Sequence, residues 1–129
     1  MNTGDGTRAI LVVDDERILA DMLASILDRS GYTSTAVYSA SEALVALKMR
    51  PDLIISDVMM PEMDGVKLAV QVSKLHPEIK ILLISGHAGT EEIVKASGLS
   101  LDFLAKPFTP IELLARVAAA LDGSTRSGQ

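Results

Sequence analysis

Three aspartates stand directly after apolar runs of strand length. Asp14 and Asp15 follow residues 9–13 (AILVV), and Asp57 follows residues 52–56 (DLIIS). If these runs are parallel strands of one sheet, their carboxyl ends share an edge and the three carboxylates come together. The three carboxylates would repel one another unless a cation is present. A set of ligands that consists only of oxygen atoms suits Mg²⁺.

Two further polar residues close later apolar runs. Ser85 ends residues 80–85 (KILLIS), and Lys106 follows residues 101–105 (LDFLA). Lys106 and Mg²⁺ together would balance the charge of the three aspartates. An acyl phosphate on Asp57 would replace one negative charge by about two. This profile is typical of a carboxylate nucleophile for phosphoryl transfer, in which positioning and neutralisation provide most of the catalysis.

The elements that must position these residues alternate along the chain. A fifth apolar run, TAV, covers residues 35–37 and lies between helical segments. Residues 18–27 carry one apolar stripe, which Gly31 closes. Two capping boxes, SASE at residues 39–42 and TPIE at residues 109–112, open helical segments that cover residues 42–48 and 111–121. The other helical segments are residues 66–75 and 90–97. Alternating strands and helices predict an α/β fold with an open parallel sheet covered on both faces.

Composition narrows the class of protein further. The chain has 129 residues, a net charge of −5, 48% hydrophobic residues and no cysteine. These values favour one domain with an aliphatic core, and they argue against a nucleic-acid surface and against thiolate or disulfide chemistry. Without a secretory signal or an apolar run of spanning length, we expect a soluble cytoplasmic protein. Residues 8–121 are expected to form the domain, and residues 1–7 and 122–129 flexible tails.

Four short motifs, taken in order, resemble a known family. VVDDE, LIISDVMMPEMDG, LLISG and FLAKPF are similar to the corresponding motifs of the receiver domain of bacterial two-component response regulators. Each motif alone is common, but the ordered set is specific, and the resemblance covers residues 8–121. It implies a doubly wound, flavodoxin-like sheet of five parallel strands in the order 2-1-3-4-5, with five helices.

The resemblance also implies a phospho-acceptor and a metal site. Asp57 matches the aspartate that accepts the phosphoryl group. Asp15 matches a direct Mg²⁺ ligand, together with Asp57 and the backbone carbonyl of Met59. Asp14 would reach the ion mainly through water. No organic cofactor is implied.

Further positions match the parts of the family that bind and report the phosphoryl group. Ser85 matches the hydroxyl residue that binds it, and Lys106 the lysine that contacts it as a point charge. The peptide bond between Lys106 and Pro107 would be cis. Phe103 holds the aromatic switch position, although it lacks the hydroxyl of the tyrosine that is frequent there.

Simpler roles remain open for several of these residues. Phe103 could be plain core, and the hydroxyl of Ser85 could merely bond to the backbone. Asp64 suits a helix cap and Gly65 a special backbone angle, so both are expected to be structural. His87 is expected to be a solvated loop residue.

The function implied is a signalling switch that is not itself an enzyme, beyond promoting its own phosphorylation and dephosphorylation. A sensor histidine kinase or a phosphotransfer protein would phosphorylate Asp57. A face formed by the fourth helix, the fifth strand and the fifth helix would then change its partner, an unidentified protein or a second copy of the chain. Neither nucleic acid nor a membrane is expected as a direct partner.

Two other functions stay in consideration. One is a receiver-like module that binds proteins without phosphorylation. The other is a Mg²⁺-dependent phosphohydrolase with an Asp nucleophile, although Met59 stands where such enzymes usually carry a second acid. The sequence leaves the cognate kinase, the output and any larger parent protein open.

Overall fold

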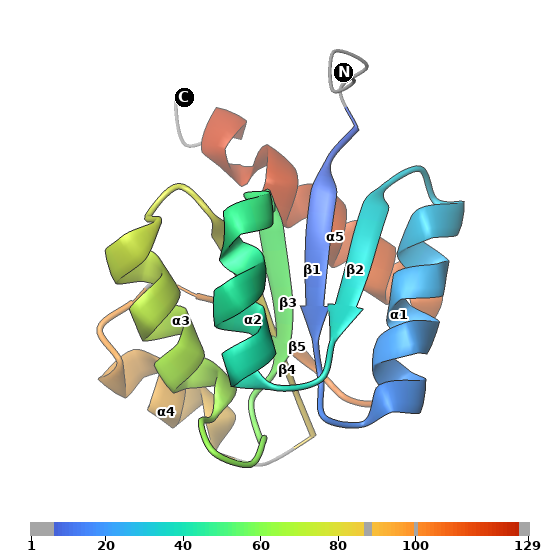
Figure 1. Cartoon of the computed structure of the whole chain (residues 1–129). Coiled ribbons are helices and arrows are strands. Elements are labelled where there is room, and N and C mark those ends of the chain that lie inside the picture. Colours follow the sequence, from blue (N-terminus) through green and yellow to red (C-terminus); the bar gives the residue numbers. More distant parts are fainter. Residues whose placement is uncertain (1–6, 87–88, 100, 127–129) are drawn as a thin grey trace.

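The architecture follows the predicted alternation of strands and helices (Figure 1). The computed structural model describes residues 7–86, 89–99 and 101–126, with side chains up to Asp122. In these residues the elements are β1 (Ala9–Val13), α1 (Arg17–Arg29), β2 (Thr33–Val37), α2 (Ala40–Ala46), the short 3₁₀ turn η2 (Leu47–Met49), β3 (Leu53–Asp57), α3 (Gly65–Leu75), β4 (Lys80–Ser85), α4 (Thr90–Ala96), β5 (Asp102–Ala105) and α5 (Pro110–Arg126).

The strands form one parallel sheet in the order β2-β1-β3-β4-β5. Both the parallel pairing and the order confirm the prediction. The chain reverses its direction of travel across the sheet between β2 and β3, as in a doubly wound fold. This reversal leaves a crevice beyond the carboxyl ends of the central strands, β1 and β3.

Two hydrophobic cores fill the space between the sheet and its helices. Residues that alternate along β1 serve both, because Leu11 and Val13 pack beneath α2, α3 and α4, whereas Ile10 and Val12 pack beneath α1 and α5. Figure 1 shows the two helical layers on opposite faces of the sheet. Burial on both faces explains why the central strands are apolar throughout.

Of the two predicted capping boxes, the one at α5 forms in full and the one at α2 forms as a variant. The hydroxyl of Thr109 accepts a hydrogen bond from the N–H of Glu112, and the Glu112 carboxylate accepts one from the N–H of Thr109. Ser39 accepts from the N–H of Glu42, but the Glu42 carboxylate accepts from the N–H of Tyr38 instead of that of Ser39. α2 therefore begins with a variant of the box in which the returning bond is displaced by one residue.

The helix α1 differs from the prediction of one apolar stripe. Leu23 and Leu27 are buried, but Ile18 is 82% exposed and Met22 is 51% exposed. The apolar residues therefore occupy two faces of α1, of which only one packs against the sheet. The helix ends before Gly31, whose φ of 99° lies in the left-handed region that favours glycine.

The C-terminal helix is longer than expected. α5 continues to Arg126, which places residues 122–126 of the expected tail in a helix. Residues 1–6 and 127–129, the rest of the two expected tails apart from Thr7, lie outside the described part of the chain. Among the helices described, none combines the length and the apolar character that crossing a membrane requires.

Candidate phosphoryl-acceptor and metal site

The carboxyl ends of neighbouring strands bring the predicted site residues to one edge of the sheet. Asp14 follows β1 directly, and Asp57 is the last residue of the adjacent β3. Asp57 pairs with Ile84 on β4, so Ser85 lies one residue further along, where it pairs with Ala105 at the end of β5. The parallel register thus gathers residues that are far apart in sequence.

Three carboxylates form a compact cluster at this edge. One oxygen from each of Asp14, Asp15 and Asp57 lies within 4.8 Å of the others. Asp14 is 2% exposed and Asp57 is 8% exposed, whereas Asp15 faces solvent. The Asp14 carboxylate also accepts a hydrogen bond from the N–H of Glu16 at 2.9 Å, which orients it. An all-oxygen cluster of this kind fits a hard divalent cation better than a softer metal.

Burial and repulsion between neighbouring charges raise the pKa of two of these carboxylates. Burial is the main cause that raises the pKa of Asp14 to about 6, and the neighbouring charge of Asp57 adds to it. Burial also raises the pKa of Asp57, although Lys106 and a backbone hydrogen bond from Met59 oppose the shift. A cation bound here would relieve both effects, because it favours the charged form of every carboxylate around it.

Lys106 supplies the positive charge that belongs to the chain itself. Its Nζ lies 3.7 Å from Oδ2 of Asp57, and the side chain is mostly buried. Its backbone N–H donates to the carbonyl of Ser85 at 2.9 Å, which fixes the start of the loop after β5 beside the end of β4. The peptide bond to Pro107 is cis, as predicted.

The loop after β3 is shaped by close packing at Gly65. A Cβ atom on Gly65 would lie 2.3 Å from the carbonyl oxygen of Asp57. Its φ is not in the left-handed region, so the expectation of a special backbone angle was wrong and close approach is the reason for glycine. The N–H of Gly65 donates to the carbonyl of Val58, and Asp64 caps α3 as predicted by accepting from the N–H of Lys67.

These residues surround a cavity of about 350 Å³ above the sheet edge. Its lining comprises Asp15, Glu16, Asp57, Met59, Gly86 and Lys106. Met59 is half-exposed and lines this cavity together with Asp57. The sequence predicted Asp15, Asp57, Met59 and Lys106 here, but it did not single out Glu16 or Gly86. His87 lies outside the described residues.

Three of the predicted site residues do not line this cavity: Asp14, which belongs to the carboxylate cluster, Ser85 and Phe103. The hydroxyl of Ser85 is buried and lies 2.8 Å from the hydroxyl of Thr90, the first residue of α4. Phe103 is half-buried and belongs to neither hydrophobic core, and its carbonyl accepts a hydrogen bond from Arg116 on α5. The sequence showed Thr90 only as a helix start, and a hydroxyl residue five positions after Ser85 was the sole signal of the contact.

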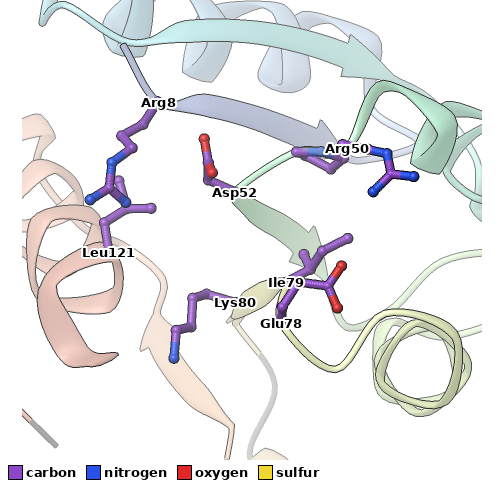
Figure 2. Close-up of a pocket in the computed structure, with 8 residues that line it drawn as sticks. Arg8, Arg50, Asp52, Glu78, Ile79, Lys80 and Leu121 are labelled. Atoms are coloured by element: carbon purple, nitrogen blue, oxygen red, sulfur yellow. The ribbon is translucent and has the colours of Figure 1, made fainter. Parts of the chain in front are cut away.

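A second cavity, of about 300 Å³, lies at the opposite, amino-terminal edge of the sheet. Figure 2 shows its lining, which comprises Arg8, Arg50, Pro51, Asp52, Glu78, Ile79, Lys80 and Leu121. Charges of both signs are spread around it, and one oxygen of Asp52 already accepts a hydrogen bond from the N–H of Ala9. This cavity does not concentrate groups of one chemical kind, in contrast to the carboxylate cluster.

Comparison with known proteins agrees with this geometry. The family model described as "Response regulator receiver domain" matches residues 10–118. The alkaline phosphatase synthesis transcriptional regulatory protein PhoP of Bacillus subtilis is 40% identical over 118 residues, which are 88% of this chain and 48% of that protein. The DNA-binding response regulator MtrA of Mycolicibacterium smegmatis is 37% identical over 115 residues, 87% of this chain and 50% of that protein. The chain thus spans about half the length of these curated relatives.

Solved structures share the fold over nearly the whole chain. A CheY-like receiver domain protein from Methanospirillum hungatei superposes with a TM-score of 0.85 at 27% identity, covering 94% of this chain and 98% of that one. A response regulator structure from Chloroflexus aurantiacus gives a TM-score of 0.80 at 34% identity, covering 89% and 98%. On the family match and these similarities, the chain belongs to the receiver domain family of two-component response regulators.

Proposed function

We propose that the chain is a phosphorylation switch in which Asp57 accepts a phosphoryl group. The observation that carries this proposal is the carboxylate cluster, in which the buried Asp57 lies beside both Asp15 and the ammonium of Lys106. Asp57 also opens onto a cavity large enough for a phosphoryl group. A solvated or purely structural aspartate would not need this combination of burial, crowding and a paired cation.

Mg²⁺ is the ion that we expect the cluster to hold. Asp15 and Asp57 would ligate it directly with the backbone carbonyl of Met59, and Asp14 would do so mainly through water. The fit rests on the all-oxygen donors and on the raised pKa of Asp14 and Asp57, which a divalent cation would lower again. When bound, the ion neutralises charge on the phosphoryl oxygens during transfer.

The chain's own residues then account for the transfer. A carboxylate oxygen of Asp57 attacks the phosphorus, and the bond between the phosphorus and the donor's oxygen or nitrogen breaks as the new bond forms. The donor leaves with that electron pair. Lys106, held 3.7 Å from Oδ2 of Asp57, remains close enough to offset the extra negative charge of the acyl phosphate. Positioning and electrostatics are therefore the main catalytic contributions.

Phosphorylation would change the conformation of the surface formed by α4, β5 and α5, which we call the α4–β5–α5 face. Ser85 would turn toward the phosphoryl oxygens, and Phe103 on the edge strand β5 would change its packing. This would shift the population between two states of the face. Exposed Ile93 on α4 and the contact between Arg116 and the carbonyl of Phe103 lie on this face. The partner would be a downstream protein or a second phosphorylated copy.

The phosphodonor would be a sensor histidine kinase or a phosphotransfer protein. The relatives named above are a transcriptional regulator and a DNA-binding response regulator, and the match ends at about half of their length. An output domain elsewhere in a parent protein and a partner in trans are therefore both compatible with this chain. The net charge of −5 disfavours direct binding of this chain to DNA, because DNA binding relies on positively charged side chains.

Acetyl phosphate with Mg²⁺ tests the acceptor directly. The intact protein should gain the mass of one phosphoryl group, and Asp57→Asn should gain none, because an amide cannot be the nucleophile. Labelling that persists in Asp57→Asn would move the nucleophile elsewhere. An absence of labelling in the wild type, also with a phosphorylated kinase as donor, would favour the phosphorylation-independent binding module.

Lys106→Ala separates ion binding from phosphoryl chemistry. Removal of a cation 3.7 Å from Asp57 should leave Mg²⁺ affinity equal or higher, since a repelling charge is gone. The same variant should lose phosphorylation or its conformational effect. Isothermal titration and intact mass measure the two properties on one sample. A loss of Mg²⁺ binding with normal labelling would contradict the assigned role.

A further inference from the structure

Ser85 and Thr90 form a buried pair of hydroxyl groups, which connects the end of β4 to the start of α4. Oγ of Ser85 lies 2.8 Å from Oγ1 of Thr90, and either atom can be the donor. The residues are 1% and 2% exposed, so water does not compete freely for this hydrogen bond. The hydroxyl pair is a direct polar link between the strand that ends at the site and the first turn of a helix.

Few residues of α4 are buried against the rest of the molecule. α4 has seven residues, of which only Thr90 and Val94 are buried. The residue before the helix, Gly89, has a φ of 86° and makes no side-chain cap. An element with so few buried contacts is easy to displace, and the loss or movement of one polar contact has a proportionally large effect on it.

The main chain at Ser85 is fixed by the sheet and by the loop after β5. The carbonyl of Ser85 accepts from the N–H of Lys106 at 2.9 Å, and Ser85 pairs with Ala105 in the sheet. A response of Ser85 to a phosphoryl group on Asp57 is therefore confined mainly to rotation of its side chain. Such a rotation changes the distance between the two hydroxyls unless Thr90 follows.

We infer that Thr90 is a positioning residue of the switch. Its hydroxyl holds Ser85 in the resting rotamer and transmits the displacement of Ser85 to the first turn of α4. A hydroxyl carries one proton, so when Ser85 donates to a phosphoryl oxygen it can only accept from Thr90. Thr90 must then donate and follow, or the hydrogen bond between the pair is lost. The inference rests on the proposed function, because Ser85 turns only if Asp57 carries a phosphoryl group.

Beryllofluoride with Mg²⁺, which mimics a phosphoryl group on Asp57, is the probe for this inference. Thr90→Val keeps the shape but removes the hydroxyl, so the resting state loses the bond between the pair. We expect beryllofluoride to bind about three- to tenfold more tightly than to the wild type, the range that one hydrogen bond supports. Thr90→Ser keeps the hydroxyl and should bind as the wild type does. Isothermal titration gives the affinities.

A double-mutant cycle shows whether the effect passes through Ser85. In a Ser85→Ala background, Thr90→Val should leave beryllofluoride affinity unchanged, because the bond is already absent. In amide ¹H–¹⁵N spectra, the shifts of the first turn of α4 on beryllofluoride binding should be smaller in Thr90→Val than in Thr90→Ser. Thr90→Ala serves as the hydroxyl-free variant if Thr90→Val does not unfold cooperatively.

The outcomes separate this inference from the proposed function. If the wild type binds beryllofluoride and the hydroxyl-free variants bind it equally well or less tightly, Thr90 does not hold the resting state. An equal effect of Thr90→Val with and without Ser85 would also overturn the inference. Failure of the wild type itself to bind beryllofluoride or to be phosphorylated would instead overturn the proposed function.

Discussion

The two edges of the sheet are both rich in charge, but they arrange it differently. At the carboxyl edge, Asp14, Asp15 and Asp57 bring oxygens within 4.8 Å of one another. At the amino edge, the charged residues that line the second cavity have both signs and are mostly exposed: Arg8, Arg50, Asp52, Glu78 and Lys80. One edge concentrates charge of a single sign, whereas the other disperses opposite charges into solvent.

The physical difference is confinement by the main chain. Asp14 and Asp57 are part of, or directly follow, buried central strands, so their carboxylates cannot move apart. Glu78 lies in a loop, where it pairs with His76 at 3.4 Å. Asp14 and Asp57 have raised pKa values, and these are the carboxylates to which a bound cation contributes most. Proximity enforced by the fold, more than the number of charges, makes the carboxyl edge the candidate functional site.

The largest expected effect is a loss of stability when a glycine near the carboxyl edge is replaced by alanine, compared with the same replacement near the amino edge. Gly65→Ala places a Cβ 2.3 Å from the carbonyl oxygen of Asp57, and we expect a loss of about 3 kcal/mol or more in the free energy of unfolding. Gly31→Ala is the control, since its Cβ meets nothing within 4 Å and only its positive φ is unfavourable. It should cost about 1 kcal/mol. Urea unfolding measures both, and equal losses would contradict the close approach at Gly65.

The next largest effect is expected on Mg²⁺ affinity, when one carboxylate is removed at either edge. Asp15→Ala should weaken Mg²⁺ binding by about 100-fold, because a direct ligand is lost. Glu78→Ala removes the same charge at the amino edge and should leave the affinity unchanged. Isothermal titration distinguishes them. Similar weakening in both variants would mean that overall charge, and not the carboxylate cluster, attracts the ion.

A smaller effect is expected from pH. Since the pKa of Asp14 is about 6, a proton competes with Mg²⁺ below this value, and the apparent affinity should fall about tenfold from pH 7 to pH 5. The metal-free protein should show the opposite trend in stability. The folded pKa lies above the unfolded value of 3.8, so stability falls as pH rises from about 4 to 6. Titrations and urea unfolding across this range test both signs, and Asp14→Asn should flatten them.

The smallest effect concerns the lifetime of the acyl phosphate. Met59 lines the cavity together with Asp57, and we expect its apolar side chain to screen the path of a hydrolytic water. Met59→Asn should therefore speed loss of the phosphoryl group several-fold by orienting water. The Mg²⁺ affinity should stay nearly constant, because only the backbone carbonyl of this residue would ligate the ion. The decay rate is measured after removal of the phosphodonor. A rate equal to or slower than wild type would exclude Met59 as the screen.

Local signals in the sequence predicted most of the fold. The period of the apolar residues and the capping boxes act within a few residues, so the elements appear close to their predicted bounds and β4 matches residues 80–85. The strand order came from resemblance to the family and not from periodicity. The ordered motifs likewise pointed to Asp14, Asp15, Asp57 and Lys106, which the sheet brings to one edge.

Contacts between distant residues were decided by the tertiary structure alone. Nothing in the pattern of α1 indicated that Ile18 would face solvent while Leu23 is buried, because the position of the sheet selects the packed face. Gly65 is required by the carbonyl of Asp57, which approaches it only after β3 and α3 have packed. The meeting of Ser85 and Thr90 depends on how α4 packs beside the end of β4. Sequence determined which groups the chain carries and where its elements begin, and packing determined which of those groups meet.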